Sequence, residues 1–177
     1  SILLVSNTSK SSSSSSSGSS SRAQIWAGDS VGTITVWKAR KSSAYKATKS
    51  STIKLNSPIE CMIEHDQAVW IGSYGSVFAV DLKTMKVVLS FQAHRGMVND
   101  LLFKDSILWT CGHDSSVNVW DVSLHPPKAD KIKTLQSHTG RVCSLEEAGN
   151  YVLSGSFDMT IMIYDSKTLE VVQEAKL

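Results

Sequence analysis

The sequence lacks the marks of several protein classes. No apolar run exceeds four residues, as in Ile2–Val5, whereas a membrane-spanning helix needs about 20. This excludes a helical membrane protein, and no secretory signal pattern begins the chain. Three cysteines among 177 residues are too few and too irregularly spaced for a disulfide framework, so we expect a reducing, intracellular and cytoplasmic setting. The chain starts at Ser1 instead of methionine, so we expect it to be a piece of a longer protein.

Acidic residues are nearly missing from the first third of the chain. Residues 1–59 contain eight Lys or Arg and one acid, Asp29, whereas residues 60–177 contain ten bases and fifteen acids. The net charge of +2 therefore hides two halves near +7 and −5. Such an asymmetry indicates a local anionic partner rather than a nucleic-acid-binding domain with a basic face throughout.

The basic residues concentrate in residues 38–54, which hold six bases and no acid. Two interpretations remain open: a solvated outer hairpin, or a contact for phosphoinositide headgroups or an acidic protein that phosphorylation of nearby Ser and Thr would weaken. Nucleic acid is not expected, because only one aromatic residue, Tyr45, lies among the bases. The candidate residues for an anionic surface are Lys38, Arg40, Lys41, Lys46 and Lys49.

Metal and cofactor motifs are also missing. The close Cys/His pairs, Cys61 with His65 and Cys111 with His113, do not form paired zinc-binding elements. Together with Cys143 we interpret these cysteines as core residues. The glycines of residues 28–32 form a turn without the following helix that a phosphate site needs. We therefore expect no metal and no cofactor.

A repeat of about 44 residues dominates the rest of the sequence. The serine-rich residues 8–22 cannot bury enough apolar surface to fold, so we interpret them as a disordered insertion. After them, a short pattern of an aliphatic residue, Trp and Gly recurs around Trp26, Trp70 and Trp109, and in altered form at Leu153. A fixed period of this length is the signature of a repeat architecture.

Each unit alternates apolar and polar residues with the period of a strand. We expect strands at about 97–103, 107–112, 116–122 and 131–136 in the third unit, and at about 141–146, 151–156, 160–165 and 170–174 in the fourth. The register makes Ile2–Val5 the first strand of the first unit. The four units then span about 1–56, 57–95, 96–139 and 140–177.

These units resemble the WD40 repeat family. The third unit contains His94-Arg95-Gly96, Gly112-His113-Asp114 and Trp120-Asp121, and the fourth runs parallel from His138 to Tyr164-Asp165. The first two units are degenerate, because they lack the histidine and the turn aspartate. The resemblance implies an all-β, WD40-like β-propeller with four four-stranded antiparallel blades that form part of a larger, seven-bladed ring. Either the rest of the protein supplies the remaining blades, which we favour, or a second copy completes the ring.

The resemblance also implies two structural tetrads. In each, an aspartate holds a histidine, the histidine meets a hydroxyl, and the hydroxyl accepts from an aromatic side chain. A catalytic hydroxyl/His/Asp set has the same residue types, but we expect these residues to be packed inside a blade with no cleft. We also expect the phenol of Tyr164 to fall short of an indole's reach. The tetrads are His94, Thr110, Asp114 and Trp120, and His138, Ser154, Asp158 and Tyr164.

The family further implies a non-catalytic protein–protein interaction scaffold, as part of a larger intracellular signalling or regulatory protein. The alternative function is an anionic-lipid-binding module that acts through residues 38–54. We expect protein partners at one edge of the propeller, which we name the partner rim. Aromatic and arginine side chains in its turns support this, since they dominate interface energetics. The partner rim consists of Tyr74, Arg95, Met97, His113, Thr139, Arg141 and Phe157.

Overall fold

Fifteen β-strands form the computed structural model, which describes residues 1–6, 22–40 and 46–176. Of the expected serine-rich insertion at 8–22, all but residue 22 lies outside these residues, as does Lys41 of the candidate anionic surface. Within the described ranges, nothing helical reaches the length and hydropathy that crossing a bilayer demands.

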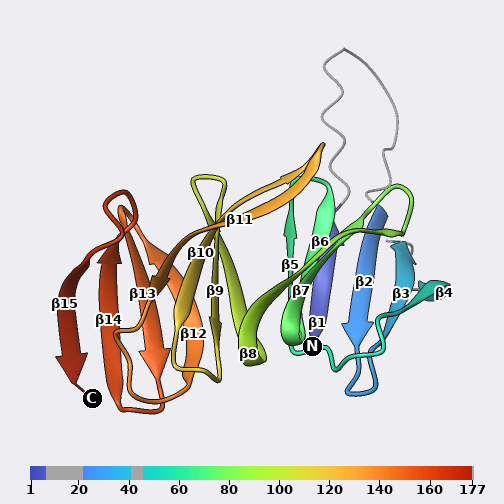
Figure 1. The fold of residues 1–177 in the computed structure, drawn as a ribbon. Helices are drawn as coiled ribbons and strands as arrows, with labels where there is room; N and C mark the ends of the chain where they lie inside the picture. The colour runs from blue at the N-terminus through green and yellow to red at the C-terminus, as the bar shows by residue number, and fades with distance from the viewer. Residues whose placement is uncertain (7–21, 41–45, 177) are drawn as a thin grey trace.

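The strands pair in chain order into antiparallel four-stranded units (Figure 1). The second and third units are joined, because β8 is the last strand of one and the first strand of the other. This pairing confirms the prediction of an all-β fold with four-stranded antiparallel sheets.

The first unit contains β1 (Ile2–Ser6), β2 (Arg22–Gly28), β3 (Thr33–Arg40) and β4 (Lys46–Lys54). The second contains β5 (Cys61–His65), β6 (Ala68–Gly72), β7 (Tyr74–Asp81) and the start of β8 (Val87–Lys104). The third adds β9 (Ile107–Gly112), β10 (Val117–Leu124) and β11 (Pro127–Leu135) to the end of β8. The fourth contains β12 (Val142–Ala148), β13 (Tyr151–Ser156), β14 (Thr160–Asp165) and β15 (Val171–Lys176).

Strand β6 shows why these short apolar segments form stacked sheets. All five of its residues are buried, although successive side chains of a strand point to opposite faces. Ala68 and Trp70 pack into the core shared with the third unit, whereas Val69 and Ile71 pack into the core shared with the first. A strand that is apolar on both faces can bury both of them only between two neighbouring sheets.

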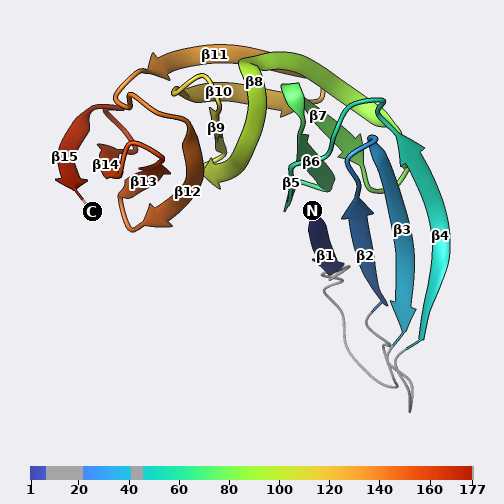
Figure 2. The ribbon, with the colours of Figure 1, turned by 90° about the horizontal axis from the view of Figure 1, so that it is seen from below.

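Three apolar cores fill the three spaces between the four units. Trp26 and Val36 belong to the first core, Trp70 and Trp120 to the second, and Trp109 to the third. Figure 2 shows the units following one another along an arc, with the first strand of each toward the concave side. The large side chains that recur in every unit are therefore the contacts between neighbouring units.

The two outer faces of the arc carry apolar side chains without a neighbouring sheet among the described residues. On the first unit, Leu4 pairs with Ile25, which pairs with Trp37, so the three lie in one row across the sheet. Leu4 is 61% exposed. On the fourth unit, Leu153 and Ile163 pair in the same way and are partly exposed.

The cysteine prediction was wrong at one position. Cys111 is buried and Cys61 is partly buried, but Cys143 is exposed. The pairing of β12 with β13 shifts between Val142 and Ser144, which places Cys143 at a bulge. A bulged residue is left out of the ladder, so the inward alternation that was expected for Cys143 does not hold.

Candidate functional site

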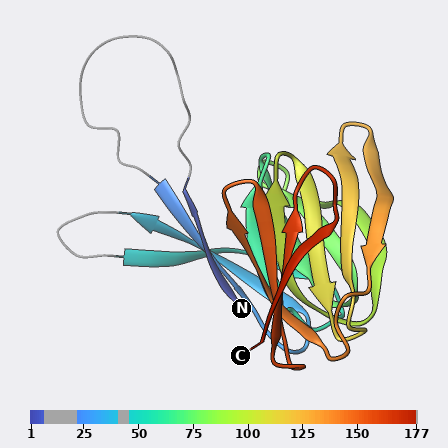
Figure 3. The ribbon, with the colours of Figure 1, turned by 90° about the vertical axis from the view of Figure 1, so that its left-hand side faces the viewer.

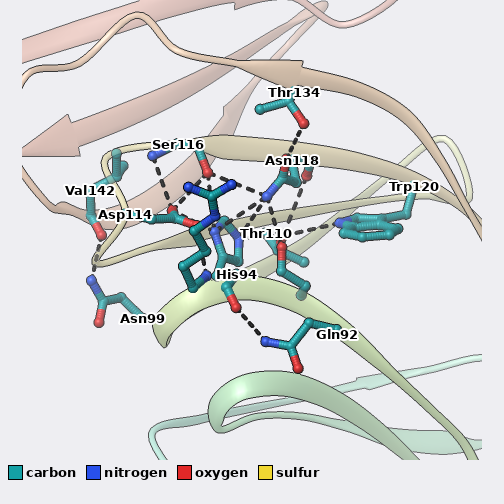
Figure 4. A network of polar contacts seen from close by, with 12 residues as sticks. Gln92, His94, Asn99, Thr110, Asp114, Ser116, Asn118, Trp120, Thr134 and Val142 are labelled. Carbon is teal, nitrogen blue, oxygen red and sulfur yellow. Dashed lines mark hydrogen bonds and ion pairs between the residues drawn. The ribbon is translucent and has the colours of Figure 1, made fainter.

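The third unit brings His94, Thr110, Asp114 and Trp120 into one hydrogen-bonded chain (Figure 4). His94 Nδ1 lies 2.8 Å from Asp114 Oδ1, and His94 Nε2 lies 2.8 Å from Thr110 Oγ1. The indole N–H of Trp120 donates to Thr110 Oγ1 over 3.1 Å. Because a carboxylate only accepts, Nδ1 carries the proton and Nε2 accepts from the threonine hydroxyl.

The charge states of His94 and Asp114 follow from burial and hydrogen bonding. Burial lowers the pKa of His94, although Asp114 opposes the shift, so the imidazole is neutral near pH 7. Burial alone would raise the pKa of Asp114, but hydrogen bonds from the Arg95 N–H, the Ser116 hydroxyl and His94 outweigh it and lower that pKa to about 2. The pair is therefore a neutral imidazole that donates to a carboxylate.

Three further polar residues extend the network. Ser116 Oγ donates to Asp114 over 2.7 Å, and Asn118 Nδ2 donates to the carbonyl of Ala93 over 2.9 Å. Thr134 Oγ1 in turn donates to Asn118 Oδ1 over 2.6 Å. These residues were not predicted from the sequence, although a hydroxyl residue stands two positions after both Asp114 and Asp158.

Gly112 makes room for the histidine ring. A Cβ atom at this position would lie 2.7 Å from the carbonyl oxygen of Met97 and 2.9 Å from the ring of His94. Both distances are shorter than real contacts allow, so a side chain here would displace the ring. The glycine next to His113 therefore belongs to the structural requirements of the tetrad.

The fourth unit repeats the arrangement with His138, Ser154, Asp158 and Tyr164. The His138 ring lies 3.0 Å from Asp158 Oδ2 and 2.7 Å from Ser154 Oγ. The expectation that Tyr164 would fall short was wrong, because its hydroxyl lies 3.2 Å from Ser154 Oγ. Tyr164 pairs with Val152 just as Trp120 pairs with Leu108, so the same register delivers the phenol to the serine.

A hollow lies beside the tetrad of the third unit, so the expectation that no cleft would adjoin these residues was wrong. Its volume is about 390 Å³, and its lining includes His94, Asp114 and Lys131. The hollow forms where β8 passes from the second unit to the third, and the sequence pattern of one unit does not predict such a crossing. Thr110 nevertheless has no exposed surface, and both ring nitrogens of His94 are engaged. The arrangement holds the blade together and presents no free nucleophile.

The partner rim is an exposed edge. The turns that join β2 to β3, β9 to β10 and β13 to β14 lie along the lower edge of Figure 1. Backbone hydrogen bonds connect the β9–β10 and β13–β14 turns to earlier residues of the same unit. The N–H of His113 donates to the carbonyl of Met97, and the N–H of Phe157 donates to the carbonyl of Arg141, both over 3.0 Å. Met97 is only partly exposed, whereas the other predicted rim residues are exposed: Tyr74, Arg95, His113, Thr139, Arg141 and Phe157.

Arg141 and Phe157 form a stacked pair on this rim. The guanidinium carbon lies 3.4 Å from the centre of the Phe157 ring, which is 63% exposed. Met159, two residues further on, is 69% exposed, and Val31 is 73% exposed in the equivalent turn of the first unit. Val31 and Met159 were not predicted as rim residues, since an apolar residue in a turn belongs to no chemical motif.

The basic residues of the first unit lie on its outer hairpin. Lys38, Lys46 and Lys49 are exposed, and no ion pair among the described residues includes them. Arg40 stands opposite Lys46 in the ladder. Elsewhere in the described part of the chain, no group of three or more His, Cys, Asp or Glu residues is arranged to hold a metal ion.

Known proteins share parts of this sequence. The chain is 32% identical over 81 residues to a probable serine/threonine-protein kinase, pats1 of Dictyostelium discoideum, which covers 46% of this chain and 2% of that protein. It is 34% identical over 95 residues to a WD repeat-containing protein of the same organism, covering 50% of this chain and 5% of that protein. A zinc finger CCCH domain-containing protein 17 of Oryza sativa subsp. japonica is 22% identical over 150 residues, covering 85% of this chain and 33% of that protein. The chain thus spans about a third or less of these relatives.

Solved structures share the fold. A chain of a mitotic checkpoint complex superposes with a TM-score of 0.70 at 18% identity, over 90% of this chain and 48% of its own length. A computationally designed protein, Ika4, superposes with a TM-score of 0.68 at 22% identity, over 80% and 84%. Both support a WD40-type β-propeller fold.

The family model of the WD40 repeated domain matches residues 1–102, and that of the WD domain, G-beta repeat, matches residues 85–121 and 129–165. The chain therefore belongs to the WD40 repeat family.

Proposed function

We propose that this chain is a non-catalytic scaffold for protein partners within a larger intracellular signalling or regulatory protein, whose other parts supply the remaining blades. The observation that carries the proposal is the exposed pair of Arg141 and Phe157. Aromatic and arginine side chains dominate the energetics of protein interfaces, and here they stand ordered on one rim without a covering element among the described residues. The three free cysteines support a cytoplasmic setting.

The charges of the partner rim favour an acidic partner. Arg95 and Arg141 are exposed on it, whereas the carboxylates of Asp114 and Asp158 are taken up by backbone N–H groups and by the histidines. The rim therefore offers cations and apolar surface together. Complementary charge raises association rates and suppresses wrong partners.

Alanine substitution tests this proposal. Proteins captured from cell extract by the unchanged chain are identified and purified, and their affinities for Arg141→Ala and Phe157→Ala are then measured. A binding residue lowers affinity about fivefold or more, which corresponds to about 1 kcal/mol, without a shift of the melting temperature. Tyr151→Ala serves as the control, since Tyr151 is 43% exposed on the same unit but outside the rim. If every captured partner binds both variants unchanged, the rim is not the site.

A second candidate function rests on the hairpin of β3 and β4. Figure 3 shows the far ends of these strands projecting away from the other sheets. Lys38, Lys46 and Lys49 are exposed on this hairpin, and no ion pair among the described residues includes them. An anionic lipid surface would supply the missing counter-charge, at about 1 kcal/mol for each basic residue near the surface.

Vesicle sedimentation separates this second function from a merely solvated hairpin. Vesicles with phosphoinositide or phosphatidylserine should retain the chain at physiological salt, whereas neutral vesicles should not. The triple change Lys38→Gln, Lys46→Gln and Lys49→Gln should abolish binding. A control triple of equal charge, Lys83→Gln, Lys167→Gln and Lys176→Gln, should leave it. Absence of binding by the unchanged chain rejects the lipid function.

A further inference from the structure

A second cavity opens between the second and third units at the edge opposite the partner rim. Its volume is about 380 Å³, within the range of roughly 300–1,000 Å³ that ligand pockets occupy. Both units that flank it are present and packed against each other through the core around Trp70 and Trp120. The cavity is therefore complete within this chain and does not depend on any additional blade.

Two tight turns bring its walls together. Asp66 and Gln67 join β5 to β6, with φ angles of 47° and 60°, and Asp105 and Ser106 join β8 to β9, with φ angles of 50° and 64°. Two successive positive φ values define the turn that fits the twist of a two-residue hairpin. The first turn places Asp66 at the cavity directly after His65, and the second contributes Ser106.

Aromatic rings form one wall of the cavity. The imidazole of His65 stacks on the ring of Phe103, with centroids 3.7 Å apart and an angle of 6° between the planes. Trp70 meets Phe103 edge-on, with centroids 5.2 Å apart. Val122 and Leu124, from the end of β10, supply aliphatic surface beside these rings. The lining of the cavity thus combines aromatic rings with aliphatic side chains.

The charge of the cavity has one sign. Asp66 is the one carboxylate in the lining, which includes no Lys or Arg, and no ion pair within the described residues uses Asp66. Burial lowers the pKa of His65, although Asp66 opposes the shift. The imidazole is therefore neutral near pH 7 and does not repel a cation.

We propose that this cavity receives an arginine side chain from a basic segment of a protein partner. A guanidinium is planar, stacks on aromatic faces and pairs with a carboxylate through two parallel hydrogen bonds, which matches His65, Phe103 and Asp66. The methylene stem of the arginine covers Val122 and Leu124, as long cationic side chains do over apolar surface. A lysine ammonium would gain the charge contact with Asp66 but not the stacking.

The cavity is separate from the partner rim and carries charge of the opposite sign, since the rim presents arginines and the cavity presents a carboxylate. One chain can therefore bind an acidic segment at one edge and a basic segment at the other. Failure of the rim proposal would leave the cavity proposal untouched, because the two tests use different residues and different probes.

Nuclear magnetic resonance of the 177-residue chain, with labelled His and Phe rings and at a protein concentration low enough that light scattering detects no aggregate, tests the cavity. The probe is Nα-acetyl-arginine N-methylamide, and the matched probe is the citrulline analogue, which keeps the shape and loses the charge. The arginine probe should shift the ring signals of His65 and Phe103 in a saturable manner. The citrulline probe should bind about tenfold more weakly, as expected for loss of one charge-assisted contact.

The variant Asp66→Asn should lower arginine affinity about tenfold. Asparagine tolerates the positive φ at this turn, so the variant should fold. The matched control is Asp105→Asn, at the equivalent turn of the next unit but outside the cavity lining. Equal binding of both probes, arginine binding that survives Asp66→Asn, or no saturable shift at millimolar probe would each overturn the proposal.

Discussion

Two buried histidines are held by matching contacts although their partner side chains differ. His94 is fixed by Asp114 and Thr110, and His138 by Asp158 and Ser154. In both units the aspartate also accepts the N–H of the residue after the histidine. Each aspartate therefore fixes the histidine side chain and the backbone of the next residue together.

Removal of the Asp114 carboxylate should destabilise the third unit. Asp114→Ala leaves the His94 Nδ1–H and the Arg95 N–H without their acceptor, and we expect the free energy of unfolding to fall by about 1–3 kcal/mol. Chemical denaturation measures this value. Asp130→Ala is the control, because its carboxylate is exposed and pairs only with Lys128 among the described residues, and it should cost about 0.5 kcal/mol or less. Equal losses would contradict the role given to Asp114.

Acidification should destabilise the chain through His94. Burial holds the pKa of folded His94 below its ordinary value of 6.5, so between these two values the unfolded chain binds a proton that the folded chain does not. Stability is thus full above about pH 6.5 and declines as the pH falls toward the folded pKa. Asp114, whose pKa is about 2, adds a further loss as the pH falls below its unfolded value of 3.8.

The melting temperature measured from pH 7.5 to pH 5 tests this dependence. His94→Asn should flatten the profile, with a remaining slope from His65, whose pKa burial also lowers. His113→Gln, at an exposed histidine, should keep the slope of the unchanged chain. An unchanged slope in His94→Asn would show that another group titrates.

The strands of the third and fourth units follow closely from their sequence. The segments expected at 107–112, 151–156 and 160–165 coincide with β9, β13 and β14, because alternating apolar residues end there at polar turns. The expected strand at 97–103 instead belongs to β8, which begins at Val87 and runs through the expected unit boundary at residue 95. Alternation shows where side chains face but not whether a ladder continues past Gly96.

The candidate sites divide in the same way. The resemblance to the WD40 family predicts the tetrad residues, and the structure brings them together. The hollow beside His94 and the cavity beside His65 were not found, since each depends on how two units dock in space. The sequence of a single repeat predicts neither the distance between two docked units nor the strand register that brings Tyr164 to Ser154.

At the scale of the elements, β8 and β12 are joined by polar clamps between units. Asn99 Nδ2 donates to the carbonyl of Val142 over 2.6 Å, and the N–H of Leu145 donates to Asp100 Oδ2 over 2.9 Å. Burial raises the pKa of Asp100, and the hydrogen bonds from the N–H groups of Leu145 and Leu101 only partly offset this shift. Two strands from neighbouring sheets are thus held by specific bonds in addition to the apolar core.

Loss of this clamp should loosen the fourth unit more than the first. Asp100→Ala leaves the buried N–H of Leu145 without its acceptor, and we expect about 1–3 kcal/mol of destabilisation. Hydrogen exchange by mass spectrometry should show faster exchange in β12–β14 and unchanged exchange in β2 and β3. Asp100→Asn keeps an acceptor oxygen and should have a smaller effect. Uniform acceleration along the whole chain would rule out a local clamp.

At the scale of the whole molecule, four blades form an open arc with two unsatisfied ends (Figure 2). The first unit exposes Leu4 and, in part, Ile25 and Trp37, and the fourth exposes Leu153 and Ile163 in part. Exposed apolar surface of this kind drives association. In water, the described residues therefore leave apolar side chains uncovered at both ends of the arc.

The isolated 177-residue chain should not be a clean monomer. Multi-angle light scattering should show a dimer or larger aggregates whose fraction rises with concentration. Leu4→Lys, which places a charge in the exposed apolar row, should reduce that fraction. Lys54→Leu, a control at an exposed position on the outer strand β4, should not reduce it. A stable monomer at high concentration would show that the apolar ends are tolerated in water.

The continuity of β8 has a mechanical consequence. Its 18 residues run from the outer edge of one blade to the inner edge of the next, so the two middle blades share one unbroken strand. Tension applied between the chain ends should peel away the first and fourth blades separately. The middle pair should then resist as one body and give way in a single longer step.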